Sequence, residues 1–151
     1  MYVIKEFEDG YNEKVNNFII SIFVEEYGFE ECRKELEEQD NFEYIKNGGK
    51  LWVALDEQDN IIGTIALVRH SNEDVELKKL YVKKDYRGKG LSKELYSKVI
   101  ETTEQQGFKR IFLGTYQKLE TAINFYLKRG FKKIDEPDEE ESGARYFELY
   151  I

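Results

Sequence analysis

The sequence contains few of the residues that form cross-links or bind metals. Its 151 residues include one cysteine, Cys32, one histidine, His70, and one proline. A single cysteine excludes an internal disulfide framework and a cysteine-rich metal site, so we expect no bound metal. We interpret Cys32 as an ordinary helix residue, and His70, which stands in a polar turn, as solvated rather than catalytic.

Long apolar runs and a targeting segment are also missing. The sequence has no stretch of about 18 apolar residues, so no membrane span is expected. The start of the chain, Met1-Tyr2-Val3-Ile4-Lys5-Glu6, lacks a charged region followed by an apolar stretch and does not resemble a signal peptide. We therefore expect a cytoplasmic protein that does not use a membrane as a partner.

Positive charge is scarce, because the chain has 23 basic and 31 acidic residues and a formal net charge of −8. A nucleic-acid binder needs a basic face to neutralise phosphates, so nucleic acid is not an expected partner. An acidic surface can steer a cationic substrate toward the protein, or it can serve solubility alone. The composition leaves both explanations open.

What the sequence does contain is sufficient for one folded domain over residues 1–151. Hydrophobic residues make up 40% of the chain, and 11 Tyr and 10 Phe predict a ring-rich core. Strand patterns cover 2–7, 51–55, 61–68, 74–82, 110–114, 131–134 and 146–150, and helical spacing covers 15–27, 30–38, 90–106 and 119–129. Residues 135–143 carry the proline and are predicted to form an exposed loop. The order of elements predicts an α/β fold with a mixed sheet.

The strand predicted for 74–82 has an irregular pattern. Val75 and Leu77 occupy odd positions, whereas Leu80 and Val82 occupy even ones, and a regular strand cannot place all four on one face. A β-bulge, one extra residue near Lys78-Lys79, would restore a common face and splay the strand from its parallel neighbour. The splay would open a slot in the sheet. The alternative is a regular strand that is buried on both faces.

A glycine-rich turn, Arg87-Gly88-Lys89-Gly90-Leu91-Ser92, leads from this strand into an amphipathic helix. Unpaired backbone N–H groups at the positive end of a helix dipole bind phosphate. Glycine allows close approach of the backbone and positive φ angles. The spacing is neither that of a P-loop nor that of a dinucleotide fold. We expect this turn to hold a phosphorylated ligand.

Three segments resemble the GNAT superfamily of N-acetyltransferases. The turn matches the pattern R/Q-x-x-G-x-G/A, with Ser92 where the family has Gly or Ala. Ala122-Ile123-Asn124-Phe125-Tyr126-Leu127-Lys128-Arg129-Gly130-Phe131 resembles the family's A-x-x-x-Y-x-K-x-G-F helix, and Glu76-Leu77-Lys78-Lys79-Leu80-Tyr81-Val82 resembles its fourth strand. Tyr27-Gly28-Phe29 is more weakly similar to GNAT domains fused to MarR-type regulators.

The resemblance covers nearly the whole chain and implies a single-domain GNAT fold of the α/β class. Such a fold has a mixed, mostly antiparallel sheet of about seven strands flanked by four helices, with a splayed slot beside strand four. It also implies acetyl-coenzyme A as the co-substrate, no metal, and a primary amine of a small molecule or peptide as the acceptor. The oligomeric state, a homodimer included, stays open.

The resemblance assigns the cofactor contacts to two segments. The pyrophosphate would lie on the backbone amides of Gly88, Lys89, Gly90, Leu91 and Ser92, and pantetheine would extend as a pseudo-strand along Leu80, Tyr81 and Val82. The side chains of Arg87 and Lys89 would pair with phosphate charge. Their other interpretation is a structural arginine and a solvated lysine.

The resemblance also assigns two catalytic residues. Glu76 lies eleven residues before Arg87, where members with a glutamate base place it. Tyr126 matches the tyrosine that protonates the departing thiolate, and a phenol with a pKa of about 10 suits that task. The alternative roles are an exposed strand carboxylate for Glu76 and core packing for Tyr126. An active N-acetyltransferase is our leading hypothesis, and a non-catalytic acyl-CoA-binding or sensing module is the alternative.

Overall fold

A computed structural model describes residues 1–136 and 143–151, so most of the loop predicted for 135–143 lies outside the described residues. The strands are β1 (Tyr2–Glu6), β2 (Lys50–Asp56), β3 (Ile61–Arg69), β4 (Asp74–Val82), β5 (Arg110–Tyr116), β6 (Lys132–Ile134) and β7 (Ala144–Tyr150). They form one sheet in the order β1-β2-β3-β4-β5-β7-β6. Within the described residues, only the β4–β5 pair is parallel. The predicted fold class is confirmed.

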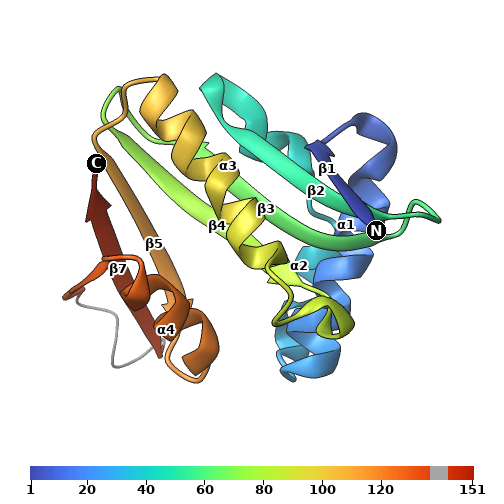
Figure 1. Cartoon of the computed structure of the whole chain (residues 1–151). Coiled ribbons are helices and arrows are strands. Elements are labelled where there is room, and N and C mark those ends of the chain that lie inside the picture. Colours follow the sequence, from blue (N-terminus) through green and yellow to red (C-terminus); the bar gives the residue numbers. More distant parts are fainter. Residues whose placement is uncertain (137–142) are drawn as a thin grey trace.

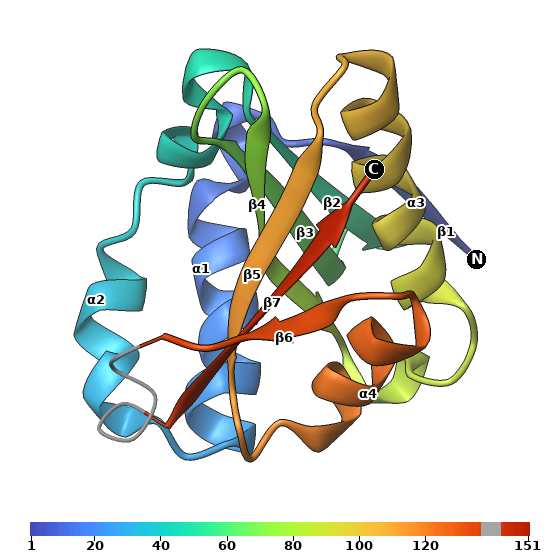
Figure 2. The same ribbon diagram turned by 90° about the vertical axis from the view of Figure 1, so that its left-hand side faces the viewer.

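The helices are α1 (Asn12–Ile20), α2 (Arg33–Glu37), α3 (Leu91–Gln105) and α4 (Glu120–Lys128). They cover both faces of the sheet, with α1 and α2 on one side and α3 and α4 on the other (Figures 1 and 2). The alternation along β2 explains this arrangement, because Trp52 and Ala54 pack with α3 while Leu51, Val53 and Leu55 pack with α1. None of the helices in the described ranges is long and apolar enough to cross a membrane.

Two local structures were not predicted from the periodicity of the sequence. The first helix changes from α-helical to π-helical hydrogen bonding over Ser21–Glu26. A segment without periodicity, Asn41–Gly48, forms 3-10 turns held to α1 by a buried amide network. In that network, the Asn41 side-chain amide donates to Asn12 Oδ1 and to Asn16 Oδ1, both at 2.8 Å. Single-turn π-helices often mark functional sites.

The predicted bulge in β4 is confirmed. Between Thr64↔Tyr81 and Ala66↔Lys78, β3 advances by two residues and β4 by three, so β4 holds one extra residue. That residue is in the left-handed region at Lys79, where φ is +58°. The apolar residues on either side of it, Val75, Leu77, Leu80 and Val82, consequently all belong to or pack against the core under α3.

The bulge separates β4 from β5. The two strands pair only over Asp74↔Arg110, Val75↔Ile111 and Glu76↔Phe112, near the start of each strand. Beyond Glu76 the β4 and β5 ribbons diverge, as Figure 1 shows. The second half of β4 therefore has no strand partner on its β5 side within the described residues.

Candidate active site

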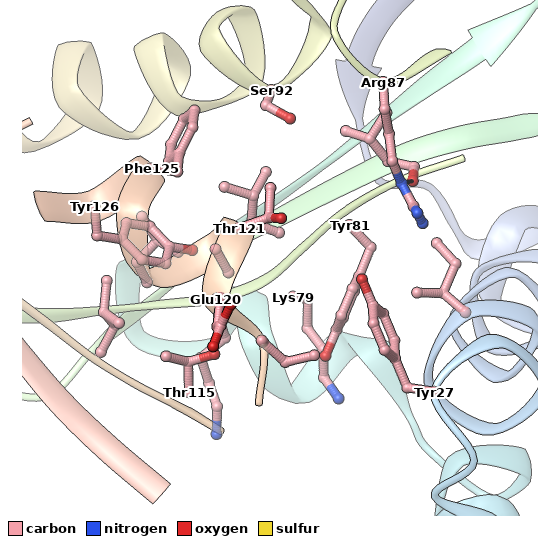
Figure 3. Close-up of a pocket in the computed structure, with 18 of the residues that line it drawn as sticks. Tyr27, Lys79, Tyr81, Arg87, Ser92, Thr115, Glu120, Thr121, Phe125 and Tyr126 are labelled. Carbon is pink, nitrogen blue, oxygen red and sulfur yellow. Dashed lines mark hydrogen bonds between the residues drawn. The ribbon is translucent and has the colours of Figure 1, made fainter. Parts of the chain in front are cut away.

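A cavity of about 640 Å³ occupies the space between the diverging strands, and we call this cavity the slot. Its described walls come from five parts of the chain: the end of the first helix, the second half of β4, the turn before α3, β5, and α4. The labelled residues of Figure 3, which all line it, are Tyr27, Lys79, Tyr81, Arg87, Ser92, Thr115, Glu120, Thr121, Phe125 and Tyr126. The slot thus brings together residues that are far apart in sequence.

The glycine-rich turn forms one end of the slot. Gly88 and Gly90 have φ of +75° and +91°, and this positive φ is the reason that glycine is required. Gly90 is the N-cap of α3, and no side chain caps this helix. The first N–H groups of α3 therefore remain available to an anion, with the helix dipole behind them.

The predicted phosphate-binding residues divide into two groups. Arg87, Gly88, Gly90 and Ser92 line the slot. The Leu91 side chain is buried under α3, so Leu91 can reach a ligand at the turn only through its backbone N–H group. The Lys89 side chain is exposed to solvent, so Lys89 can reach such a ligand through its backbone N–H group or its side chain.

The Arg87 guanidinium is held by protein groups. Its Nε donates to the Val82 carbonyl at 2.9 Å, and Nη1 and Nη2 donate to the two carboxylate oxygens of Glu26 at 2.5 and 2.8 Å. The hydrogen bonds from Arg87 lower the pKa of Glu26. In this structure Arg87 therefore has the role of a structural arginine, which connects the π-helical segment to the turn.

The segment predicted to bind pantetheine, Leu80, Tyr81 and Val82, forms a wall of the slot. The bulge that frees this segment is fixed by Thr64, whose hydroxyl donates to the Lys79 carbonyl at 2.6 Å. Because strand β5 has moved away, main-chain groups on this edge of β4 are open to an extended ligand.

Tyr126 lies on the inner side of α4, and its hydroxyl is directed toward the interior of the slot (Figure 3). The residue is only 5% exposed and packs edge-on against Phe125 and Phe131, at ring distances of 5.6 and 5.5 Å. Burial raises the pKa of the Tyr126 hydroxyl. The group consequently stays protonated and able to donate a proton at neutral and moderately alkaline pH.

Glu76 lies at the end of β4 where β4 and β5 still pair, and it is not among the described residues that line the slot. Its neighbours Val75 and Leu77 face α3, so Glu76 points to the opposite face of the sheet. Glu76 Oε1 is 2.8 Å from His70 Nε2, and Oε2 is 3.9 Å from Lys78 Nζ. The predicted base, Glu76, thus points away from the side of the sheet on which α4 carries the predicted acid, Tyr126.

His70 is exposed, as the sequence predicts, and its side chain also contacts Glu76. The His70 ring also packs on Phe112, with a centroid distance of 4.9 Å. The contact between His70 and Glu76 could have been predicted from the hairpin, because Val68 pairs with Glu76 and His70 lies two residues further along the same face. Such diagonal pairs are within reach of long side chains.

Lys79 also lines the slot, although the sequence reasoning did not assign it a function. Its Nζ lies 5.9 Å from the centre of the Tyr44 ring. Burial, together with the nearby charge of Lys78, lowers the pKa of the Lys79 ammonium to about 8. The parity break at Lys78-Lys79 could have indicated this residue, since a bulge redirects the side chain beside it.

Known proteins share this fold and its sequence features. The model of the acetyltransferase (GNAT) family matches residues 16–131, and the chain belongs to this family. A GNAT-family acetyltransferase from Staphylococcus aureus Mu50 is 33% identical, with a TM-score of 0.86 and coverage of 99% of both chains.

Two further proteins extend the comparison. An uncharacterized N-acetyltransferase of Mycobacterium tuberculosis is 37% identical over 90 residues, which are 60% of this chain and 58% of that protein. This chain therefore matches little more than half of the relative's length. The PaiA N-acetyltransferase of Thermoplasma acidophilum was solved with coenzyme A, and covers 100% of this chain and 99% of its own. At 21% identity and a TM-score of 0.71, its likeness shows the fold alone.

Proposed function

We propose that this protein transfers the acetyl group of acetyl-coenzyme A to a primary amine of a small molecule or peptide, by direct attack of the amine on the thioester. The observation that carries the proposal is the slot, which joins a phosphate-type turn to the buried hydroxyl of Tyr126. The fold neighbour solved with coenzyme A supports the donor. In this proposal, residues 1–151 form one N-acetyltransferase domain.

The residues at the slot suit this donor. Backbone N–H groups of Gly88, Lys89, Gly90, Leu91 and Ser92 would hold the diphosphate, because no side chain caps the helix that follows them. The open edge over Leu80, Tyr81 and Val82 would bind the extended pantetheine arm, as a strand is added to a sheet edge. A thioester carbonyl on this edge would accept a hydrogen bond from a freed backbone N–H group.

The nitrogen of the substrate ammonium loses two protons in the reaction, one before attack and one after the bond to carbon forms, and the departing sulfur gains one proton. The amine nitrogen forms a bond to the thioester carbonyl carbon, and the carbon–sulfur bond breaks. Tyr126 would donate its proton to the departing sulfur and regain one from the solvent. Glu76 would accept the proton of the substrate ammonium through water, since its carboxylate does not line the slot.

Turnover with a panel of primary amines tests the proposed function. Purified protein with acetyl-coenzyme A should release free thiol only when an acceptor is present, and mass spectrometry should show the acetylated amine. Glu76→Gln tests the base. Its rate should fall most at pH 7 and recover as the pH approaches the pKa of the amine itself, because the free amine needs no base.

The exposed Glu73 on the same hairpin provides the control, since Glu73→Gln removes a similar charge away from the slot. Loss of simple charge attraction would raise KM and weaken with added salt, instead of changing the pH profile. A Glu76→Gln rate that equals the wild-type rate across the pH range would remove Glu76 from the mechanism.

The position of Glu76 favours a second candidate function, a non-catalytic acyl-CoA-binding or sensing module. In such a module the turn and the open strand edge would hold the ligand, and Glu76 would serve only to fix His70. Tight binding of acetyl-coenzyme A without thiol release, for every amine of the panel, would establish this function in place of the enzyme.

A further inference from the structure

The charges around the slot have an uneven distribution. Among the described residues that line it, Glu120 is the single carboxylate, whereas the cations are Lys78, Lys79, Arg87, Lys93 and Lys118. Three of the five cations have other roles available. Arg87 is paired with Glu26, Lys78 lies 3.9 Å from Glu76, and Lys93 stands in the first turn of α3 beside the phosphate-type turn.

Lys79 and Lys118 remain, and neither forms an ion pair within the described residues. In Figure 3 the Lys79 ammonium lies across the slot from Ser92 and α3. The phosphate-type turn is therefore at the opposite side of the slot. A diphosphate bound at that turn would leave the Lys79 ammonium without an ion-pair partner within the described residues, although the charge of Glu35 acts on it from a greater distance.

Several aromatic rings pack near Tyr81, which lines the slot, although Phe23, Phe29 and Tyr116 are not among the described lining residues. Phe23 stacks on Phe29 with centroids 4.5 Å apart, and its ring lies 6.3 Å from that of Tyr81. Tyr116 contacts Phe29 at 4.9 Å, and Lys118 Nζ lies 3.9 Å from the centre of the Phe29 ring. The rings supply no formal charge, so the two lysines are the cations on this side, while the carboxylates of Glu31 and Glu35 act on it from outside the slot.

The bulge directs Lys79 into this position. The left-handed conformation at Lys79 and the hydrogen bond from Thr64 to its carbonyl fix the backbone from which the side chain starts. A lysine with positive φ is uncommon, and placing its ammonium away from solvent is costly without a partner. A ligand that supplies a negative charge would offset that cost.

We propose that the acceptor is a small amine that also carries a carboxylate, and that Lys79 binds this carboxylate and determines the specificity. This inference rests on the proposed function, because it concerns the second substrate of the same slot. Amines with several positive charges would be repelled by Lys79 and Lys118, whereas an amino acid presents one ammonium for reaction and one carboxylate for binding.

The titration of Lys79 agrees with this geometry. The groups whose charges act on it are Lys78, Glu35 and Cys32, and the Tyr44 ring of the 3-10 segment lies 5.9 Å from its Nζ. With a pKa of about 8, the ammonium is charged at pH 7 and loses its proton as the pH rises. Binding of a carboxylate should therefore weaken above pH 8, and a bound carboxylate should raise the pKa of Lys79.

The test uses the full-length protein, acetyl-coenzyme A and a matched set of acceptors. The set contains glycine, β-alanine, 4-aminobutyrate, aspartate and glutamate, their carboxamides, and the diamine putrescine. Each is assayed with wild type, Lys79→Met, Lys79→Arg and, as a control, Lys83→Met, which removes an exposed charge just beyond β4. Calorimetry with coenzyme A present measures acceptor binding independently of turnover.

Wild type should prefer at least one carboxylate over its carboxamide by about tenfold or more in kcat/KM, as expected for a charge-assisted contact. Lys79→Met should abolish this preference through KM while the KM for acetyl-coenzyme A stays within twofold, and Lys79→Arg should retain part of it. Lys83→Met should keep the full preference.

Two results would overturn the inference. Either putrescine and the carboxamides are the better acceptors of the wild type, or Lys79→Met retains the carboxylate preference. In both cases turnover itself would leave the proposed function standing. Conversely, binding of carboxylates that requires Lys79, without transfer to any amine, would support the anion site and reject the enzymatic function. Absence of both binding and turnover would reject both proposals.

Discussion

At the scale of single residues, the proposed proton donor to the departing sulfur is the hydroxyl of Tyr126, which lines the slot. Its ring is fixed between Phe125 and Phe131, so Tyr126→Phe removes the hydroxyl and preserves the packing. We expect kcat to fall by about 100-fold, the lower end for general acids, because a coenzyme thiolate is a fair leaving group. Thiol release measures the rate, and calorimetry should show an unchanged affinity for acetyl-coenzyme A.

Tyr96 is a matched control for this substitution. It is also buried, also contacts Phe125 and Phe131, and is not among the described residues that line the slot. Tyr96→Phe should leave kcat within a factor of about two. If Tyr126→Phe behaves in the same way, Tyr126 is a packing residue and another group protonates the sulfur.

Lys79 should reduce the stability of the folded protein at neutral pH. Its pKa is about 8 in the folded chain and near 10.5 in the unfolded chain. At a pH between these two pKa values, the unfolded chain therefore binds more protons than the folded chain. The free energy of unfolding should therefore rise as the pH increases from 8 to 10. Lys79→Met should add about 1–3 kcal/mol at pH 7, since a shift of one pKa unit corresponds to about 1.4 kcal/mol.

Urea unfolding of both proteins at pH 7, 8, 9 and 10 measures this effect. Methionine has the same unbranched shape and accepts the same backbone strain, so the difference reports on charge. The stability gained by Lys79→Met should shrink toward pH 10 as wild type loses the buried charge. A difference that does not change with pH would show that the Lys79 ammonium is well solvated in the folded state.

The turn before α3 is the element on which cofactor binding should depend. A Cβ at Gly90 would meet open space, but the φ of +91° is strained for any other residue. Gly90→Val should therefore weaken binding of acetyl-coenzyme A at least about tenfold, because the turn must shift and the added side chain faces the phosphate position. Calorimetry on the folded variant measures the affinity.

Gly107, at the other end of α3, allows the strain to be separated from the binding. It has a φ of +78° and also no neighbour within 4 Å of a Cβ, so Gly107→Val imposes a similar backbone cost far from the slot. We expect a comparable loss of stability with unchanged affinity. Equal affinities for the Gly90 and Gly107 variants would remove the phosphate assignment from the turn.

Most elements could be predicted from the sequence because their apolar residues repeat with a clear period. The strongest case is β4, where a break in the alternation located the bulge and therefore the split in the sheet. The π-helical segment Ser21–Glu26 could not be predicted, since its apolar residues continue the spacing of α1 without a change. The 3-10 segment was missed because its fold depends on contacts between Asn41 and α1 rather than on its own pattern.

The candidate site was predictable where it depends on the backbone and less so where it depends on side-chain partners. Gly88 and Gly90 adopt the positive φ that the motif requires. Arg87, in contrast, binds Glu26, which is 61 residues away in sequence, and no local pattern could indicate that pair. The same holds for the aromatic cluster beside Lys79, whose rings come from separate elements.

At the scale of the whole molecule, the pair of Glu26 and Arg87 connects the helix layer of α1 to the turn before α3. Both side chains are about one-third exposed, so the contribution of the pair is modest. We expect Glu26→Gln to lower the free energy of unfolding by about 0.5–1 kcal/mol at low salt. Because the pKa of Glu26 is lowered, this contribution exists at neutral pH and disappears as acid protonates the carboxylate.

The same variant tests the role of Arg87 in binding. If backbone amides carry the phosphate contact, the affinity for acetyl-coenzyme A should change less than threefold when Glu26→Gln releases the guanidinium. A marked increase in affinity would show that Arg87 leaves Glu26 for the phosphate. Titration by calorimetry at two salt concentrations distinguishes these results, because an added phosphate contact increases the dependence on salt.

The short ladder between β4 and β5 has a mechanical consequence. Within the described residues, three residue pairs join the four-stranded N-terminal part of the sheet to β5, β7 and β6, so few main-chain hydrogen bonds resist bending along this line. A ligand that fills the slot and forms main-chain hydrogen bonds with β4 would connect the two parts of the sheet and make it stiffer. In the proposed cycle, the protein would be most rigid while the acetyl donor is bound and would loosen when coenzyme A departs, which couples product release to the flexing of the sheet itself.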